Sequence, residues 1–292
     1  MPGHRTSLSE LFAIFLRLGL TSFGGPIAHI GYFHTEFVER RRWLSNEAFG
    51  DLVALCQFLP GPASSQVVIG IGLGRGGIPG ALIASLGFTL PSALLMIGFG
   101  YGITSLGGGL GGAAWIHALK VVAVAVVAQA LWAMARTLCP DRLRGTIALG
   151  AGALLVLWPG STGQIIAILS GAALGWWLCN PSAPEQHSAM QLPLGRSTAI
   201  AMLLTFAVIL GIALVPAPVT DAHGFALFSA MFQSGALVFG GGHVLLPLLE
   251  AETVRTGWVN QDLFLAGYGA AQALPGPLFT FAAFLGTVQT PA

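Results

Sequence analysis

The chain has 292 residues, of which 54% are hydrophobic and only 8% are charged. Soluble domains usually carry about 25% charged residues, so the composition excludes an ordinary soluble domain and predicts an all-α polytopic membrane protein. The formal net charge of +1 says nothing about partners. The cysteines are too scattered for a disulfide framework or a structural metal, and we expect no metal, no cofactor and no nucleic-acid partner.

Apolar segments follow one another along the chain. They run roughly over residues 8–33, 49–73, 78–103, 113–137, 146–158, 162–179, 197–216, 224–249 and 262–287. The N-terminal segment lacks a small-residue cleavage site after a short apolar core, so we expect no removable signal peptide. The least apolar stretch, residues 180–197, is typical of a linker and separates residues 1–179 from residues 198–292.

The two parts share a sequence pattern, which predicts an internal duplication. At an offset of 216 residues, Phe12, Gly19, Phe23, Gly24 and Gly25 match Phe228, Gly235, Phe239, Gly240 and Gly241. At an offset of 215, Trp43, Phe49, Gln57 and the Leu-Pro-Gly-Pro run 59–62 match Trp258, Phe264, Gln272 and the run 274–277. Matching interruptions in two halves are typical of secondary transporters. We therefore expect residues 1–179 to form a first transporter repeat and residues 198–292 a second, incomplete one.

The placement of arginine predicts how the repeats are oriented, because cytoplasmic loops collect lysine and arginine. If the segments around the glycine and proline motifs are re-entrant hairpins, five full spans lie between residues 78 and 216. The arginines that then fall on the cytoplasmic side are Arg40, Arg41, Arg42, Arg75, Arg136, Arg142, Arg144 and Arg196. Because five is odd, the second repeat begins on the opposite side, which predicts an inverted-repeat transporter with broken helices.

Each repeat contains two interruptions, a glycine motif and a Pro-Gly-Pro motif. A helix that begins after such a break exposes unpaired N–H groups and a partial positive charge of roughly +0.5 e, which suits an anion. Irregular backbone at membrane depth survives only when it is buried in protein or lines a wet cavity. The expected oxyanion-binding residues are Gly24, Gly25, Pro26, His29, Gln57, Pro60, Gly61, Pro62, Ser64, Ser65, Gln66, Gly240, Gly241, Gly242, His243, Gln272, Pro275, Gly276, Pro277 and Thr280. The alternative is that the breaks are kinks that only help the helices to pack.

Several ionisable residues carry two interpretations each. Arg17 lies in the first apolar segment with Glu10 as the nearest preceding acid, and it either balances the charge of a dianion or extends to the cytoplasmic surface. His29 and His243 each follow a glycine break and either bind substrate and relay protons or pack through hydrogen bonds.

The charged residues after the first break also carry two interpretations. Asp51 is expected to pair with an arginine of the cluster 40–42, and a role as proton carrier is the alternative. The cluster itself satisfies the positive-inside rule. The alternative hypothesis is that Arg41 and its neighbours form a cytoplasmic gate that attracts anions.

Five stretches resemble the signatures of the chromate ion transporter family in its long, two-repeat form. They are "LGLTSFGGPIAHIGYFHTEFVERRRWL", "FGDLVALCQFLPGPASSQ", "GFTLPSA", "GALVFGGGHVLLPLLE" and "FLAGYGAAQALPGPLFTFAAFLG". The resemblance implies export of chromate across the bacterial inner membrane by a multi-pass protein whose two halves have opposite topology. It also implies several further helices, so the chain is expected to be short at its C-terminus.

The expected function is secondary active export of chromate, with no enzymatic activity. Because the sequence has no nucleotide-binding motif, the membrane potential or a proton gradient would supply the energy, with protons as a coupling ion. Uptake or exchange of sulfate or another oxyanion by the same fold is the alternative. A membrane-embedded enzyme or a non-transporting subunit ranks lower, because the apolar segments hold almost no carboxylates. Apart from the lipid bilayer, a homodimer is a partner that the sequence leaves open.

Overall fold

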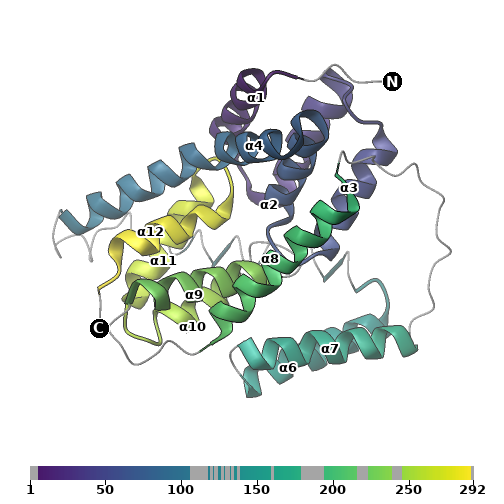
Figure 1. Cartoon of the computed structure of the whole chain (residues 1–292). Helices are drawn as coiled ribbons and strands as arrows, with labels where there is room; N and C mark the ends of the chain where they lie inside the picture. Colours follow the sequence, from purple (N-terminus) through teal and green to yellow (C-terminus); the bar gives the residue numbers. More distant parts are fainter. Residues whose placement is uncertain are drawn as a thin grey trace. The chain divides into compact units, whose positions relative to one another are not determined.

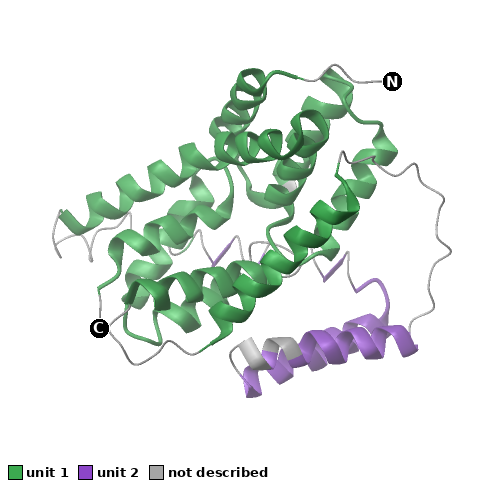
Figure 2. Ribbon diagram, in the orientation of Figure 1, with its two compact units in different colours: residues 1–121, 187–292 green, residues 122–186 purple. Residues whose placement is uncertain are grey.

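The computed structural model of the protein describes residues 6–105, 139–158, 161–178, 194–215, 223–238 and 245–290, with isolated positions between 118 and 136. All regular structure within these residues is helical, as the composition predicts. The chain divides into two compact units, residues 1–121 with 187–292 and residues 122–186 (Figure 2). The predicted linker at 180–197 lies mostly outside the described residues, and the repeat boundaries stay a prediction.

The first part of unit 1 is a series of helices interrupted at the sequence motifs (Figure 1). The elements are α1 (Leu8–Thr21), α2 (Gly25–His34), the π-helical turn η1 (Thr35–Arg40), α3 (Asn46–Phe58) and α4 (Ala63–Ser105). Serines start two of them, since Ser7 accepts a hydrogen bond from the Glu10 amide and Ser45 from the Ala48 amide. The expected segments 8–33 and 49–73 are therefore each broken in two.

The second part of unit 1 repeats this order after α8. The elements are α8 (Arg196–Leu214), α9 (His223–Ala236), α10 (Leu245–Thr253), α11 (Gln261–Ala273), the 3-10 turn η3 (Leu278–Thr280) and α12 (Phe281–Val288). Both α3 and α11 have 13 residues. Asn260 starts α11 as Ser45 starts α3, by accepting a backbone N–H hydrogen bond on its side chain. The sequence offset of 215 therefore corresponds to matching local structure.

Helix α4 bends sharply at Gly77, where φ is 64° and ψ is −155°. A positive φ strains residues with a side chain, so glycine permits this break. Beyond it, Gly80, Ala84, Gly87 and Gly100 face the interior, whereas Leu82, Leu86, Leu90 and Leu94 form an exposed apolar stripe. Small residues on the buried side allow other helices to come close, as in membrane proteins generally.

Helix α1 packs against the middle of this long helix, and α12 packs nearer to its C-terminal end (Figure 1). A Cβ atom at Gly19 would lie 2.5 Å from the carbonyl oxygen of Phe88, so only glycine lets α1 approach α4 this closely. Fully buried aromatic rings fill the space beside this contact; the centroids of Phe15 and Phe37 lie 5.3 Å apart, as do those of Phe33 and Phe88. This core holds α1, α2, η1 and α4 together.

Two described helices are long and apolar enough to cross a membrane, α4 and α8. α4 contains the expected span 78–103, and α8 covers residues 197–214 of the expected span 197–216. The shorter apolar helices include Leu278–Val288 in unit 1 and Ile166–Leu178 in unit 2. Unit 2 contains the packed pair α6 (Arg142–Leu157) and α7 (Ser161–Leu178), at the expected segments 146–158 and 162–179 (Figure 2). The expected span 113–137 lies largely outside the described residues.

Candidate functional site

The Gly-Gly-Pro motif separates α1 from α2. Ser22 ends α1 in an extended conformation, and Gly24 and Gly25 follow with φ of 93° and 74°. Because both values lie in the left-handed region, glycine is required at each position. Pro26 then starts α2, where its missing N–H group costs nothing. The break expected here is confirmed, whereas the corresponding Gly240, Gly241, Gly242 and His243 lie outside the described residues.

The two Leu-Pro-Gly-Pro motifs adopt closely similar backbone conformations. Leu59 is extended, with φ of −72° and ψ of 148°, and Leu274 is extended, with φ of −88° and ψ of 151°. Gly61 and Gly276 follow with φ of 120° and 97°. A new helix begins after each motif, at Ala63 and at Leu278. The prolines therefore interrupt the helix at matching places in the two halves.

Each Pro-Gly-Pro motif is bound to the opposite half of unit 1. The Gly61 amide donates to the carbonyl of Val238 at 2.6 Å, and the Gly276 amide donates to the carbonyl of Ser22 at 2.9 Å. Ser22 and Val238 are 216 residues apart; Ser22 follows α1 directly, and Val238 lies two residues after the end of α9. The contact is therefore reciprocal; we call the contact of Gly61 with Val238 the first crossing and that of Gly276 with Ser22 the second crossing. In this conformation the two glycine amides are not available to an anion.

The second crossing contains buried polar groups beside Ser22. The Ser22 carbonyl lies 3.2 Å from His29 Nε2, which fixes the proton on that nitrogen because a carbonyl can only accept. His29 Nδ1 and the Ser22 hydroxyl are buried and have no hydrogen-bond partner within the described residues. Unsatisfied buried polar atoms are rare, so they mark this place as one where a water or a ligand group would be stabilised.

Two other predicted residues line the same crossing. The Thr280 hydroxyl donates to the Pro277 carbonyl at 2.8 Å and accepts from Ser92 at 2.7 Å, so it joins η3, just before α12, to α4. Gln272 donates to the Tyr268 hydroxyl at 2.8 Å, and its Oε1 atom lies close to Gly25. The structure therefore brings Gln272, Gly25, His29 and Gly276 to one region.

The first crossing is more open than the second. Gln57 is exposed and so is its neighbour Phe58, with 80% of its surface accessible. Gln66 donates to the Pro60 carbonyl at 2.7 Å, and its Oε1 atom is buried without a partner among the described residues. Ser64 is buried and Ser65 half-buried in the first turn of α4. The two copies of the motif thus differ in environment as well as in sequence.

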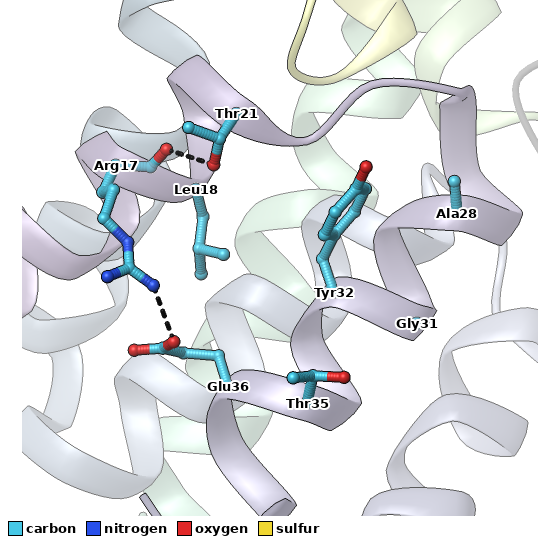
Figure 3. A pocket seen from close by; sticks show the side chains of 8 residues that line it. All are labelled: Arg17, Leu18, Thr21, Ala28, Gly31, Tyr32, Thr35 and Glu36. Atoms are coloured by element: carbon cyan, nitrogen blue, oxygen red, sulfur yellow. Dashed lines mark hydrogen bonds and ion pairs between the residues drawn. The ribbon is translucent and has the colours of Figure 1, made fainter. Parts of the chain in front are cut away.

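A separate pocket of about 550 Å³ lies between α1, α2 and η1 (Figure 3). The residues that line it are Arg17, Leu18, Thr21, Ala28, Gly31, Tyr32, Thr35 and Glu36. Figure 3 shows Arg17 and Tyr32 on either side of the pocket, with Glu36 next to Arg17 at its edge. The hydroxyls of Tyr32 and Thr35 make no hydrogen bond to other described residues, so they are available to a ligand.

Glu36 is the centre of an arginine cluster beside this pocket. Its side chain is only 5% exposed and accepts from Arg17 at 2.8 Å, from Arg40 at 3.3 Å and from Arg41 at 2.7 Å. Burial alone would raise the pKa of Glu36, but the hydrogen bond from Arg41 and the charges of the three arginines outweigh it and hold the pKa below its ordinary value. Glu36 is therefore charged near neutral pH.

The cluster extends to the loop that follows η1. Arg41 also contacts Glu10 at 3.4 Å, and the guanidinium groups of Arg41 and Arg75 lie 5.2 Å and 4.3 Å from the ring centre of Trp43. Four guanidinium groups thus face two carboxylates, and the field around the pocket is positive. The sequence order suggested Glu10 as the acid for Arg17; the partner is instead Glu36, which sequence reasoning missed. The signal was the spacing of "EFVERRR", in which Glu36 precedes Arg40 and Arg41 by about one turn.

The remaining predicted residues have simpler positions. Asp51 lies in α3, and the proposed pairing with the arginine cluster stays a prediction. No group of three or more histidine, cysteine, aspartate or glutamate side chains within the described residues could hold a metal ion. The candidate site therefore consists of the two crossings and the pocket at Arg17.

Comparison with known proteins identifies the family. The profile of the family described as "Chromate transporter" matches residues 9–176 and 225–291, which is most of the chain. The chain belongs to the chromate transporter family. It is therefore an all-α membrane transporter, in agreement with the fold class expected from the sequence.

Individual relatives agree with this assignment. The chromate transport protein of Pseudomonas aeruginosa is 28% identical, over 97% of this chain and 67% of that protein. The probable chromate transport protein of Synechococcus elongatus is 30% identical, over 96% of this chain and 69% of that protein. An uncharacterized transporter of Methanocaldococcus jannaschii is 25% identical, over 97% of this chain and 69% of that protein. No solved structure matches the chain.

Proposed function

We propose that this chain exports chromate across the bacterial inner membrane as a multi-pass secondary transporter. The observation that carries the proposal is the reciprocal pairing of the Gly61 amide with Val238 and of the Gly276 amide with Ser22, in a member of the chromate transporter family. Each broken helix end is held by the other half of unit 1. A relative movement of the halves would therefore change both crossings together, as alternating access requires.

The proposed binding site is the region around the crossings. In another conformation the amides of Gly61 and Gly276 would leave their carbonyl partners and face the substrate, as N–H groups at helix starts do for anions. His29 and Gln272 lie beside the second crossing, and Gln57, Ser65 and Gln66 beside the first. The glycine motif at 240–242 and His243 would complete the arrangement by symmetry. Selection of chromate over sulfate would depend on donor spacing and pocket size, because the two dianions have the same charge.

The membrane potential is a sufficient energy source for export. Moving one charge through 100 mV changes the free energy by about 2.3 kcal/mol, so a dianion leaving an inside-negative cell gains about 4.6 kcal/mol. A proton gradient would add to this if a buried group carries protons. His29 is the candidate, because its Nδ1 atom has no hydrogen-bond partner among the described residues and so has a free position for a proton. The proposal describes transport without chemical change of the substrate.

Flux into proteoliposomes tests the function. With chromate outside, an imposed inside-positive potential is expected to drive accumulation, and the reversed potential is expected to suppress it. A pH gradient at zero potential then separates proton coupling from simple movement of charge. Sulfate in excess measures selectivity through competition. Absence of chromate flux under every imposed gradient, in liposomes that contain folded protein, would refute the proposed function.

A further inference from the structure

The pocket at Arg17 has the features of an anion site that is separate from the crossings. Its cavity of about 550 Å³ lies within the size range of ligand sites, roughly 300–1,000 Å³. Arg17 is half exposed and uses a single side-chain hydrogen bond, to Glu36, within the described residues. A guanidinium group carries five N–H donors in a planar fork, which suits two oxygens of a tetrahedral oxyanion. Most of the donors of Arg17 are therefore available to a ligand.

Glu36 does not depend on Arg17 for its charge balance. Arg41 contacts Oε1 of the carboxylate, while Arg40 shares Oε2 with Arg17. If Arg17 turns toward the pocket, the buried carboxylate keeps two cationic partners. The remaining bonds from Arg40 and Arg41 keep the carboxylate paired, and the bound anion replaces Glu36 as the partner of Arg17. Arg17 is thus the member of the cluster that can leave Glu36, and it is also the arginine that lines the pocket.

The second half of unit 1 lacks this arrangement. At the offset of 216, which matches the first helices of the two halves, Arg17 corresponds to Gln233. At the offset of 215, which pairs Trp43 with Trp258, Arg40 corresponds to Arg255, but Arg41 and Arg42 correspond to Thr256 and Gly257. Gln233 donates instead to the Ala213 carbonyl of α8. The second half therefore has a glutamine in place of the arginine that lines the pocket.

We propose that the pocket between α1, α2 and η1 is a loading site for tetrahedral oxyanions, at which Arg17 turns from Glu36 to the anion and Tyr32 donates from the opposite wall. The site lies on one face of the transporter because the second half has Gln233 in place of Arg17. In the orientation expected from the positive-inside rule, that face is cytoplasmic, where an exported anion enters. The identity of the anion as chromate rests on the proposed function.

Calorimetric titration of the intact chain in detergent, with chromate and separately with sulfate, tests the loading site. The key pair is Arg17→Gln and Arg40→Gln, because both arginines contact the same Glu36 oxygen but only Arg17 lines the pocket. Arg17→Gln is expected to weaken oxyanion binding roughly tenfold to hundredfold, as for loss of a hydrogen bond to a charged group. Arg40→Gln is expected to weaken it less than about threefold. Arg17→Lys should fall between them, because it keeps the charge and loses the fork.

Two results would overturn this inference. Equal losses in Arg17→Gln and Arg40→Gln would mean that the arginines act only through a diffuse field, and unchanged binding in Arg17→Gln would mean that the pocket takes no anion. If Arg17→Gln does not elute as a single folded species, the Tyr32→Phe variant tests the site instead. Its affinity for the oxyanion is expected to fall roughly twofold to tenfold. Unchanged affinity in Tyr32→Phe would then reject the site.

Flux separates this inference from the proposed function. A wild-type chain that binds oxyanions through Arg17 but moves no chromate would refute transport and leave the loading site intact. A wild-type chain that transports chromate with the same KM as Arg17→Gln would refute the loading site and leave transport intact.

Discussion

Substitution of Gly276 by alanine tests the crossing of the two halves. At φ of 97°, a residue with a side chain is strained by about 1–3 kcal/mol. The added Cβ atom would also lie 2.8 Å from Cβ of Ser92 and 3.2 Å from the Gly19 carbonyl oxygen, and such overpacking costs about 1–3 kcal/mol. The expected total loss of stability for Gly276→Ala is about 2–6 kcal/mol.

Two other glycines provide matched controls. Gly61 has the same place in the other half and a φ of 120°, but its Cβ would meet only the flexible Gln66 side chain. Gly61→Ala should therefore cost the strain and the bond from Gln66 to Pro60, about 1.5–4.5 kcal/mol. Gly286 lies in α12 with no atom within 4 Å of its Cβ position, so alanine there should stabilise the helix by up to about 1 kcal/mol.

Thermal stability in detergent, followed by the fraction of monodisperse protein after heating, ranks the three variants. A change of 1 kcal/mol shifts the Tm of a 150–250-residue domain by roughly 2–4 °C. We therefore expect Gly276→Ala to lower the Tm by roughly 4 °C or more, Gly61→Ala to lower it less, and Gly286→Ala to leave it equal or higher. If Gly276→Ala is as stable as Gly286→Ala, Gly276 does not lie against Ser92 and Gly19, and the described crossing is wrong.

Three further predictions concern the proline breaks, the arginine cluster and the contact between α4 and α12. Replacing Pro60 and Pro62 together by alanine should lower chromate flux in proteoliposomes while the protein stays folded, because α3 could then continue into α4; unchanged flux would favour simple packing kinks. The pKa of Glu36 in the folded protein is held below its ordinary value of 4.5. The contribution of Glu36 to folding stability is therefore complete above pH 4.5 and is lost as the pH falls through the pKa of the folded state. Glu36→Gln should thus lower the free energy of unfolding at pH 7 by about 1–3 kcal/mol. In a series of Tm measurements against pH, the variant should also lose less Tm than the wild type as the pH falls. An equal decrease of Tm at all pH values would contradict the role assigned to Glu36. Ser92→Ala should lower stability by about 0.5–1.5 kcal/mol, measured as a Tm decrease, because it removes the buried donor to Thr280; no decrease would show that the bond contributes nothing.

The two halves of unit 1 differ in the loading site and in the burial of their Pro-Gly-Pro motifs. The first half carries the positive pocket and a half-buried Pro-Gly-Pro break, and the second half buries its break fully, against α1 and α4. The family profile matches segments of both halves, so the shared motifs alone do not distinguish them. The asymmetry is therefore a property of the sequence between matching motifs, where Arg17 and Arg41 of the first half are replaced by Gln233 and Thr256.

The sequence by itself determined the membrane class, the helical architecture and the positions of the breaks. Composition excluded a soluble protein, and the Gly-Gly-Pro and Leu-Pro-Gly-Pro motifs located the ends of α1, α3 and α11, because proline and positive-φ glycine act locally on the backbone. The break inside α4 at Gly77 was likewise visible as the gap between two apolar segments. Local geometry is encoded by neighbouring residues, so a linear reading is sufficient for it.

The tertiary structure alone decided which groups meet. That the Gly276 amide binds Ser22 and the Gly61 amide binds Val238 depends on residues more than 170 positions apart, and no local pattern specifies such a contact. The choice of Glu36 rather than Glu10 as the partner of Arg17 depends in the same way on how α1 packs against η1. Periodicity predicts which face of a helix is apolar, but the partner of a charged side chain is set by the packing of distant elements, which the sequence order does not reveal.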